Sequence, residues 1–284
     1  MIMIMKKISL FLLVFVVSFV FAQNYKVVYQ VSWKPSKEKD SVYTDLSVLV
    51  IDENKSYFAG YNTYYSDSLK TNIVDSHISN SKDGSLRIPD SKKSLFRKII
   101  LKNIASDSII QEEKFYITTF HIQSSCKPKW KLHNEETLIL GYKAKKASTE
   151  FRGRKWSAWY ATEIPISDGP YKFYGLPGLI LKISDEKEDY IFEAKGITNE
   201  MVKLHYRHFG LPNPVLLTEK KWFDFYKKYQ KHPSIVLENL NTSSTTFVIN
   251  GKEIDRDIKK EYDEREKKYL KDNNNEIELN SSCL

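Results

Sequence analysis

Apolar and polar residues alternate strictly along the first segment that carries a clear structural pattern. From Tyr25 to Trp33 every second residue is aromatic or β-branched, and most of the residues between them are polar. A period of two is typical of a strand with one buried face. The pattern returns at Leu46–Val50, and Asp52–Lys55 has the composition of a turn into a second strand at Tyr57–Phe58.

Short strand-like segments continue along the chain, separated by clusters of Asp, Ser, Lys and Asn. They span residues 96–101, 109–110, 115–121, 130–132 and 137–142. Their spacing favours an antiparallel meander. The polar stretch Ser66–Pro89 contains a run of Ser, Asn, Lys, Asp and Gly, and we expect it to be a surface loop.

Two hairpins are predicted in the middle of the chain. In the first, the alternating segments 147–151 and 156–160 flank Gly153, which permits a tight turn. In the second, the alternating segment 179–183 is expected to pair with the alternating segment 190–194. Each hairpin presents one apolar face, so both should contribute to the same buried sheet surface.

The character of the sequence changes after Pro214. Thr218 is a good cap for a helix whose aromatic residues recur at helical spacing, with Pro233 just beyond its end. These aromatic residues are Trp222, Phe225, Tyr226 and Tyr229. A second helix is expected over about Lys252–Lys271, with a thin apolar stripe of Ile254, Ile258 and Tyr262.

These elements predict a mainly β (α+β) fold. The sheet is an antiparallel meander that can curl into a half-barrel, with the C-terminal helices packed on it. We find no break that requires a second domain after residue 22. The organisation expected is therefore one domain over 23–284, β-rich over about 23–200 and helical over about 215–272.

Residues 1–22 have the pattern of a secretory signal peptide. Lys6 and Lys7 precede the apolar run Leu10–Phe21, and Ala22 is a suitable residue before cleavage. Since the run is too short to span a bilayer comfortably and no later segment is apolar enough, no integral membrane segment is expected after cleavage. The sequence thus predicts an exported protein, periplasmic or extracellular, which argues against nucleic acid as a partner.

Charge is unevenly distributed. The chain has 44 basic and 36 acidic residues, a formal net charge of +8, and the excess is concentrated between Lys127 and Lys155. That segment holds nine basic residues against Glu135, Glu136 and Glu150. Two interpretations stay open: a solvated strand face, or a surface for an anionic envelope or extracellular partner.

One six-residue motif carries a resemblance. The motif Gly175-Leu176-Pro177-Gly178-Leu179-Ile180 resembles the signature of the GLPGLI family, exported proteins of Bacteroidetes, and its surroundings are similar from Gly141 to Phe173. The resemblance implies export but no established biochemical activity. This chain has Ala144 where that family often has Cys, so no disulfide or metal role is carried over there.

Physical reading of the motif favours a structural role. Pro177 fixes its own backbone and biases Leu176 toward extended geometry, while Gly175 and Gly178 permit positive φ or close backbone approach. A sharp turn leading into a strand is expected. The alternative is a ligand-binding loop, but the motif offers only backbone groups for such contacts.

Candidate ligand-binding residues lie in the first of the two hairpins. Arg152 and Arg154, at i and i+2, would share a sheet face and hold a carboxylate, phosphate or sulfate if Gly153 does not bulge. Alternatively they pair with Glu150 or Glu163. Trp156, Trp159 and Tyr160 could line an apolar or sugar-binding surface, although aromatic residues of alternating strands are more often core.

No catalytic, cofactor or metal motif is found. His205-x-x-His208 lacks a helical context and a third ligand, so no metal and no cofactor are expected. The only two cysteines, Cys126 and Cys283, either form a disulfide or remain two free thiols. The tail around Cys283 is rich in Asn and Ser, a composition typical of a mobile segment.

Three functions remain in competition. The preferred one is a noncatalytic module that binds an anionic or apolar envelope ligand, or an envelope protein. The second is an exported hydrolase whose active site is assembled by the fold from groups such as Arg152, Glu163, Asp168 and His205. The third is an accessory to an outer-membrane transporter or secretion system.

Overall fold

A computed structural model describes residues 24–79, 93–116, 118–199, 213–238, 247–249, 252–254 and 258–281. The predicted signal segment 1–22, the pair His205 and His208, and Cys283 lie outside these residues. Among the helices described, none is both long enough and apolar enough to cross a membrane.

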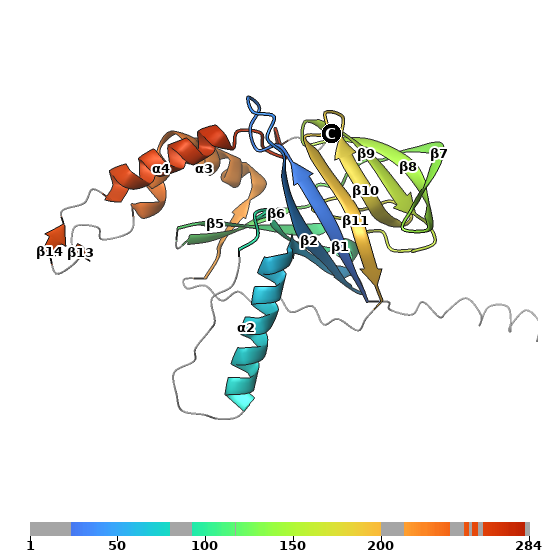
Figure 1. The fold of residues 1–284 in the computed structure, drawn as a ribbon, viewed down its shortest axis with the longest axis horizontal. Helices are drawn as coiled ribbons and strands as arrows, with labels where there is room; N and C mark the ends of the chain where they lie inside the picture. Colours follow the sequence, from blue (N-terminus) through green and yellow to red (C-terminus); the bar gives the residue numbers. More distant parts are fainter. Residues whose placement is uncertain are drawn as a thin grey trace, which may run out of the picture.

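Twelve strands form one sheet, built from two meanders (Figure 1). The first meander contains β1 (Tyr25–Trp33), β2 (Tyr43–Asp52), β3 (Lys55–Gly60), β4 (Ile99–Asn103), β5 (Ser108–Phe115) and β6 (Thr118–Ser124). The second contains β7 (Lys131–Ile139), β8 (Tyr142–Phe151), β9 (Arg154–Ala161), β10 (Leu179–Asp185) and β11 (Tyr190–Thr198). The ladder between β1 and β11 joins them at the centre of the sheet.

The sheet is mostly antiparallel and does not close. Its edges are β7 and the short β12 (Val215–Thr218), which pairs in parallel with β6. The rings of Phe58 on β3 and Phe192 on β11 lie 6.2 Å apart, although β2 and β1 separate their strands. Since three strand spacings amount to about 14 Å on a flat sheet, this contact shows that the sheet is strongly curved. The predicted mainly β fold with a curled meander is confirmed.

The core fills the concave side of this curved sheet. Tyr29, Phe58, Trp156, Phe173 and Phe192 are at most 2% exposed and belong to one apolar cluster. They come from both meanders and from the connection between β9 and β10. Edge-to-face contacts among these rings, such as Phe58 with Phe192, are the favourable geometry for aromatic pairs.

The C-terminal helices pack at the β5–β6 end of the sheet. Helix α3 (Glu219–Lys231) begins where Thr218 Oγ1 accepts a hydrogen bond from Lys221 N, as predicted. Trp222 contacts Phe120 of β6 and Phe115 of β5. Helix α4 (Ile258–Asp272) packs through Tyr262 on Tyr229 of α3. Two short 3₁₀ helices, η1 (Ile104–Ser106) and η2 (Pro233–Leu237), and a small hairpin, β13 (Phe247–Ile249) with β14 (Lys252–Ile254), complete the elements.

Two predicted boundaries are wrong. The second C-terminal helix begins at Ile258 rather than near Lys252, because residues 252–254 form β14. The stretch expected to be a loop from Ser66 is helical up to Ser79, within α2 (Tyr61–Ser79). This helix is rich in Ser, Thr, Asn and Asp and has no apolar stripe, so the periodicity that identifies most helices is missing. It extends away from the sheet in Figure 1.

Candidate functional site

The turn between β8 and β9 positions the two candidate arginines differently. Arg152 and Gly153 both have positive φ, 54° and 81°, as a type I′ hairpin turn requires. Arg152 therefore lies in the turn, and only Arg154 belongs to a strand. The expected arrangement at i and i+2 on one strand face is wrong, because Arg152 is itself a residue of the tight turn.

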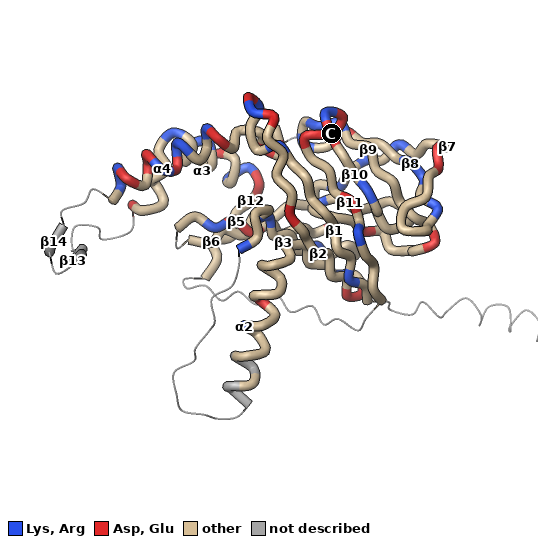
Figure 2. Tube along the Cα trace, viewed as in Figure 1, with Lys and Arg blue, Asp and Glu red and all other residues tan. Residues whose placement is uncertain are grey.

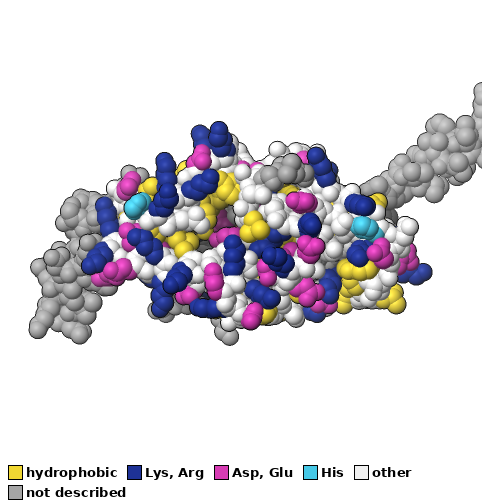
Figure 3. Space-filling view, turned by 90° about the horizontal axis from the view of Figure 1, so that it is seen from above, with side chains coloured by type: hydrophobic (Ala, Val, Ile, Leu, Met, Phe, Trp, Pro, Cys, Tyr) yellow, Lys and Arg dark blue, Asp and Glu magenta, His cyan; other side chains and the backbone are white. Residues whose placement is uncertain are grey.

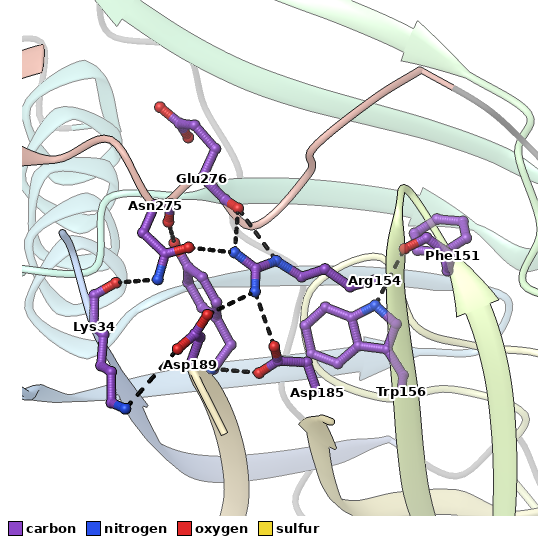
Figure 4. Close-up of polar contacts among 9 residues, drawn as sticks. Lys34, Phe151, Arg154, Trp156, Asp185, Asp189, Asn275 and Glu276 are labelled. Atoms are coloured by element: carbon purple, nitrogen blue, oxygen red, sulfur yellow. Dashed lines mark hydrogen bonds and ion pairs between the residues drawn. The ribbon is translucent and has the colours of Figure 1, made fainter. Parts of the chain in front are cut away.

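Arg154 is the centre of a buried polar network (Figure 4). Its Nη1 donates to Asp185 Oδ2 at 2.8 Å and to Asp189 Oδ2 at 3.2 Å. Its Nη2 donates to Asn275 Oδ1 at 2.6 Å and to the carbonyl of Glu276 at 2.7 Å. The planar guanidinium thus donates hydrogen bonds at the same time to two carboxylates and to the segment that contains Asn275 and Glu276.

Arg152 makes a second set of contacts to distant parts of the chain. Its Nη1 donates to the carbonyl of Ser281 at 2.7 Å, and Nη2 donates to Ser124 Oγ at 3.2 Å. Nη2 is also ion-paired with Glu219, the first residue of α3. The guanidinium is 1% exposed. Arg152 therefore links the hairpin, the end of β6, helix α3 and the C-terminal residues.

The segment Asn273–Ser281, which we name the C-terminal strap, is the common partner of both arginines. Ile277 is 3% exposed and belongs to the main core cluster. Glu278 Oε1 accepts hydrogen bonds from Lys172 Nζ at 2.6 Å and from Tyr171 Oη at 2.9 Å. Burial alone would raise the pKa of Glu278, but nearby Lys172 and Arg152 bring it below its ordinary value.

The strap differs from the mobile tail that the sequence suggested. Asn275 donates to the carbonyl of Lys34 at 2.9 Å, and its own carbonyl accepts from Tyr190 Oη at 2.6 Å. The strap thus ties the loop after β1 to the β10–β11 and β8–β9 hairpins. Both arginines are engaged internally, with Glu219, Asp185 and Asp189 as ion-pair partners rather than Glu150 or Glu163. An external anion could reach either guanidinium only by displacing these partners.

The three candidate aromatic residues separate onto two faces of β9. Trp156 and Tyr160 are 2% and 3% exposed and belong to the core cluster. Trp159, one residue out of phase with them, is half-buried on the opposite face. Lys146 Nζ lies 5.9 Å from the centroid of the Trp159 ring. Only Trp159 of the three is therefore placed for contact with an external molecule.

The six-residue signature forms a turn into β10, as its physical reading predicted. Gly175 has a φ of 96°, and Leu176, Leu179 and Ile180 are buried. A Cβ at Gly178 would lie 2.2 Å from the carbonyl oxygen of Ala161. Pro177 is the exposed tip. The glycines are explained by backbone geometry, Gly175 by its positive φ and Gly178 by close approach.

A buried ion pair lies beneath this turn. Lys102 Nζ pairs with Asp168 and donates to the carbonyl of Gly169 at 2.6 Å. Burial lowers the pKa of Lys102, and the charge of Asp168 opposes that shift. Asp168 is 0% exposed and its Oδ2 has no hydrogen-bond partner. The pair is enclosed by core residues and presents no reactive atom to the surface.

Of the groups proposed for a hydrolase, the three that lie among the described residues each have separate partners. Arg152 is held by Glu219, and Asp168 is held by Lys102. Glu163 is exposed and accepts a hydrogen bond from the backbone N–H of Lys143. No cluster of three His, Cys, Asp or Glu side chains suited to a metal ion occurs among the residues described. Cys126 is buried and disulfide-bonded, whereas Cys283 lies outside the described part of the chain.

A row of side chains on the convex face of the sheet is the best candidate surface. We name it the outer row: Lys146 on β8, Trp159 on β9, Lys182 on β10, Glu193 on β11 and Gln30 on β1. Every member is half-buried, and their neighbours along the strands are buried, except for the exposed Lys145 on β8. Because paired residues of neighbouring strands share a face, the outer row forms one continuous line across five strands.

Comparison with known proteins gives a short match to one family model and a likeness of fold. A family model described as a protein of unknown function (Porph_ging) matches residues 151–182, the stretch from the β8–β9 turn through the signature into β10. No curated protein matches the chain.

The similar solved structures include PNGF-II in two crystal forms. The structure in space group C2 has 18% sequence identity and a TM-score of 0.50, covering 74% of this chain and 34% of PNGF-II. The structure in space group P21 has 18% identity and a TM-score of 0.49, with the same coverage. The chain thus corresponds to about a third of the length of PNGF-II. At this identity the likeness shows the fold alone, a mostly antiparallel sheet with accompanying helices.

Proposed function

We propose that the protein is an exported, noncatalytic binding module of the cell envelope and a member of the GLPGLI family, and that it binds through the convex face of its sheet. The observation that carries this proposal is the outer row, where an aromatic ring and two lysines are partly exposed on a regular, rigid surface. Sites built on strands hold their side chains more firmly than sites on loops. The signal-like residues 1–22 support export.

The basic residues between Lys127 and Lys155 also support this face, even when the two buried arginines are not counted. Arg152 and Arg154 serve internal contacts, but Lys146 and Lys155 remain at the surface of the same hairpin. Basic and acidic residues are interspersed rather than separated, both along the strands in Figure 2 and on the face of the molecule seen from above in Figure 3. Such a mixed surface favours a local contact with an anionic group over long-range attraction of a polyanion.

A hydrolase has less support. Catalysis would need at least two reactive groups within hydrogen-bond reach of one substrate position. Arg152, Glu163 and Asp168 each have separate partners, and the buried Lys102–Asp168 pair is enclosed.

Capture from envelope extract tests the proposal. The mature chain, residues 23–284, would be immobilised beside two variants, Lys182→Glu on the outer row and Lys143→Glu, an exposed lysine of β8 on the other strand face. We expect a component that is retained by the parent and by Lys143→Glu but lost from Lys182→Glu. Equal retention by all three would place binding elsewhere, and no retention above background would overturn the proposed function.

A further inference from the structure

Resting on the proposed function, we propose that the outer row is a binding site for an acidic oligosaccharide, with one sugar ring stacked on Trp159 and anionic groups held by Lys146 and Lys182. The three residues are direct cross-strand neighbours, since Trp159 pairs with Lys146 on one side and with Lys182 on the other. Two strand spacings place the lysine backbones about 10 Å apart. The ring lies between two positive charges.

Trp159 has the partial exposure that a stacking platform needs. Its core-facing neighbours Ala158 and Tyr160 are 0% and 3% exposed, whereas Trp159 is half-buried on the convex face. The ring packs against the main core cluster, which fixes it, and Lys146 Nζ lies over it at 5.9 Å from its centroid, while part of the ring stays exposed. A sugar ring has an apolar C–H face bordered by hydroxyl groups, and an aromatic ring in a polar surrounding matches both features.

The two lysines remain available for a ligand. Lys146 Nζ lies 3.2 Å from Glu135, but the side chains are 32% and 56% exposed. Surface pairs of this kind contribute little, so a ligand anion can replace Glu135 at small cost. Lys182 forms no ion pair within the part of the chain that the structure describes. Its cross-strand neighbour Glu193 is paired instead with Lys195, at 3.1 Å.

Polar side chains next to the platform can bind hydroxyl groups. Ser157 of β9 and Ser184 of β10 are cross-strand neighbours and half-buried on the same face. Gln30 and Glu193 extend the row onto β1 and β11. Hydroxyl and amide groups both donate and accept hydrogen bonds, as recognition of a sugar rim requires. An anionic lipid surface or a protein partner would instead favour a larger continuous apolar area beside the charges.

Calorimetric titration of the mature chain with defined oligosaccharides tests this inference. The probes are an oligogalacturonate as the acidic ligand, a neutral oligosaccharide of equal length, and free galacturonate. We expect the acidic oligomer to bind more tightly than the neutral one, with an affinity that falls as salt rises. Trp159→Ala and Lys146→Ala/Lys182→Ala should each weaken binding about tenfold or more.

Matched controls separate a binding role from a structural one. Lys143→Ala/Lys145→Ala removes the same amount of charge from the other face of β8, the strand that carries Lys146, and should change affinity by less than about twofold. Should Trp159→Ala fold poorly, Trp159→Phe keeps an apolar ring and is expected to retain part of the affinity. In addition, the indole N–H signal of Trp159 should shift on titration of the unmodified protein.

The outcomes distinguish this inference from the proposed function. Equal affinity for neutral and acidic oligomers, or equal effects of the two lysine pairs, would overturn the acidic oligosaccharide site. Capture of a protein through Lys182, with no affinity for either oligosaccharide, would overturn it while leaving the proposed binding module intact. Absence of any ligand in both experiments would overturn both.

Discussion

Arg154 donates a hydrogen bond of 2.6 Å to the side chain of Asn275, a residue 121 positions further along the chain. Asn275 in turn donates to the carbonyl of Lys34, near the beginning of the described chain. Three segments distant in sequence are therefore held by one pair of side chains. The consequences for stability can be tested with single substitutions.

Replacing Arg154 with Met should lower the free energy of unfolding by about 3–5 kcal/mol, because Asp185, which is buried, would be left without its ion-pair partner. Chemical denaturation followed by circular dichroism measures this difference. Lys155→Met is the control, since Lys155 is 68% exposed and should change stability by about 0.5 kcal/mol or less. Similar losses for both variants would contradict a special role for Arg154.

The strap should contribute to the core through Ile277. Ile277→Ala removes a side chain that is 3% exposed and should cost about 2–4 kcal/mol. Leu279→Ala, two residues further on, removes an aliphatic group that is 48% exposed and should cost about 0.5 kcal/mol or less. If thermal or chemical unfolding finds the two variants equally stable, the strap does not pack as described.

Acid should destabilise the protein through Glu278. Its pKa is lower in the folded chain than its ordinary value of 4.5, so the carboxylate contributes stability above about pH 4.5. That contribution is lost as the pH falls through the lower folded value. Glu278→Gln should therefore show a flatter dependence of unfolding free energy on pH below 4.5. Parallel pH profiles for the parent and the variant would argue against the ion pair with Lys172.

Gly178 should tolerate no side chain. In Gly178→Ala the new Cβ would lie 2.2 Å from the carbonyl oxygen of Ala161, so the turn and β9 would have to separate. We expect a loss of about 2 kcal/mol or more. Gly196→Ala in β11 is the matched control, because a Cβ there meets nothing within 4 Å. The control should be neutral or slightly stabilising, by up to about 1 kcal/mol.

Most strands could be predicted because each has one buried face. Tyr25–Trp33 and the two central hairpins follow the period of two, and the structure places strands there. Helix α3 could also be predicted, from its capping residue and from the helical spacing of its aromatic residues. Helix α2 was missed since its polar residues show no periodicity. The predicted segments 130–132 and 137–142 were wrong in their bounds, because β7 runs without a break over Lys131–Ile139 and charged residues within an exposed edge strand look like a loop.

The candidate site was less predictable. The arginines were proposed as ligand-binding residues, but the structure pairs them internally with Glu219, Asp185 and Asn275, which come from segments whose proximity depends on the whole sheet. An Asn-rich tail carries no pattern that distinguishes a buried strap from a free end. The outer row likewise depends on register: Lys146, Trp159 and Lys182 become neighbours only when three strands are aligned.

The topology also sets an order in which the protein can fold. Each meander can form from neighbouring segments, but β1 must wait for β11, and the core is complete only when Ile277 of the strap has joined it. Contacts between such distant positions form slowly. A chain emerging from the ribosome therefore cannot complete its core until Ile277 has been synthesised, and it remains open to chaperones during that time.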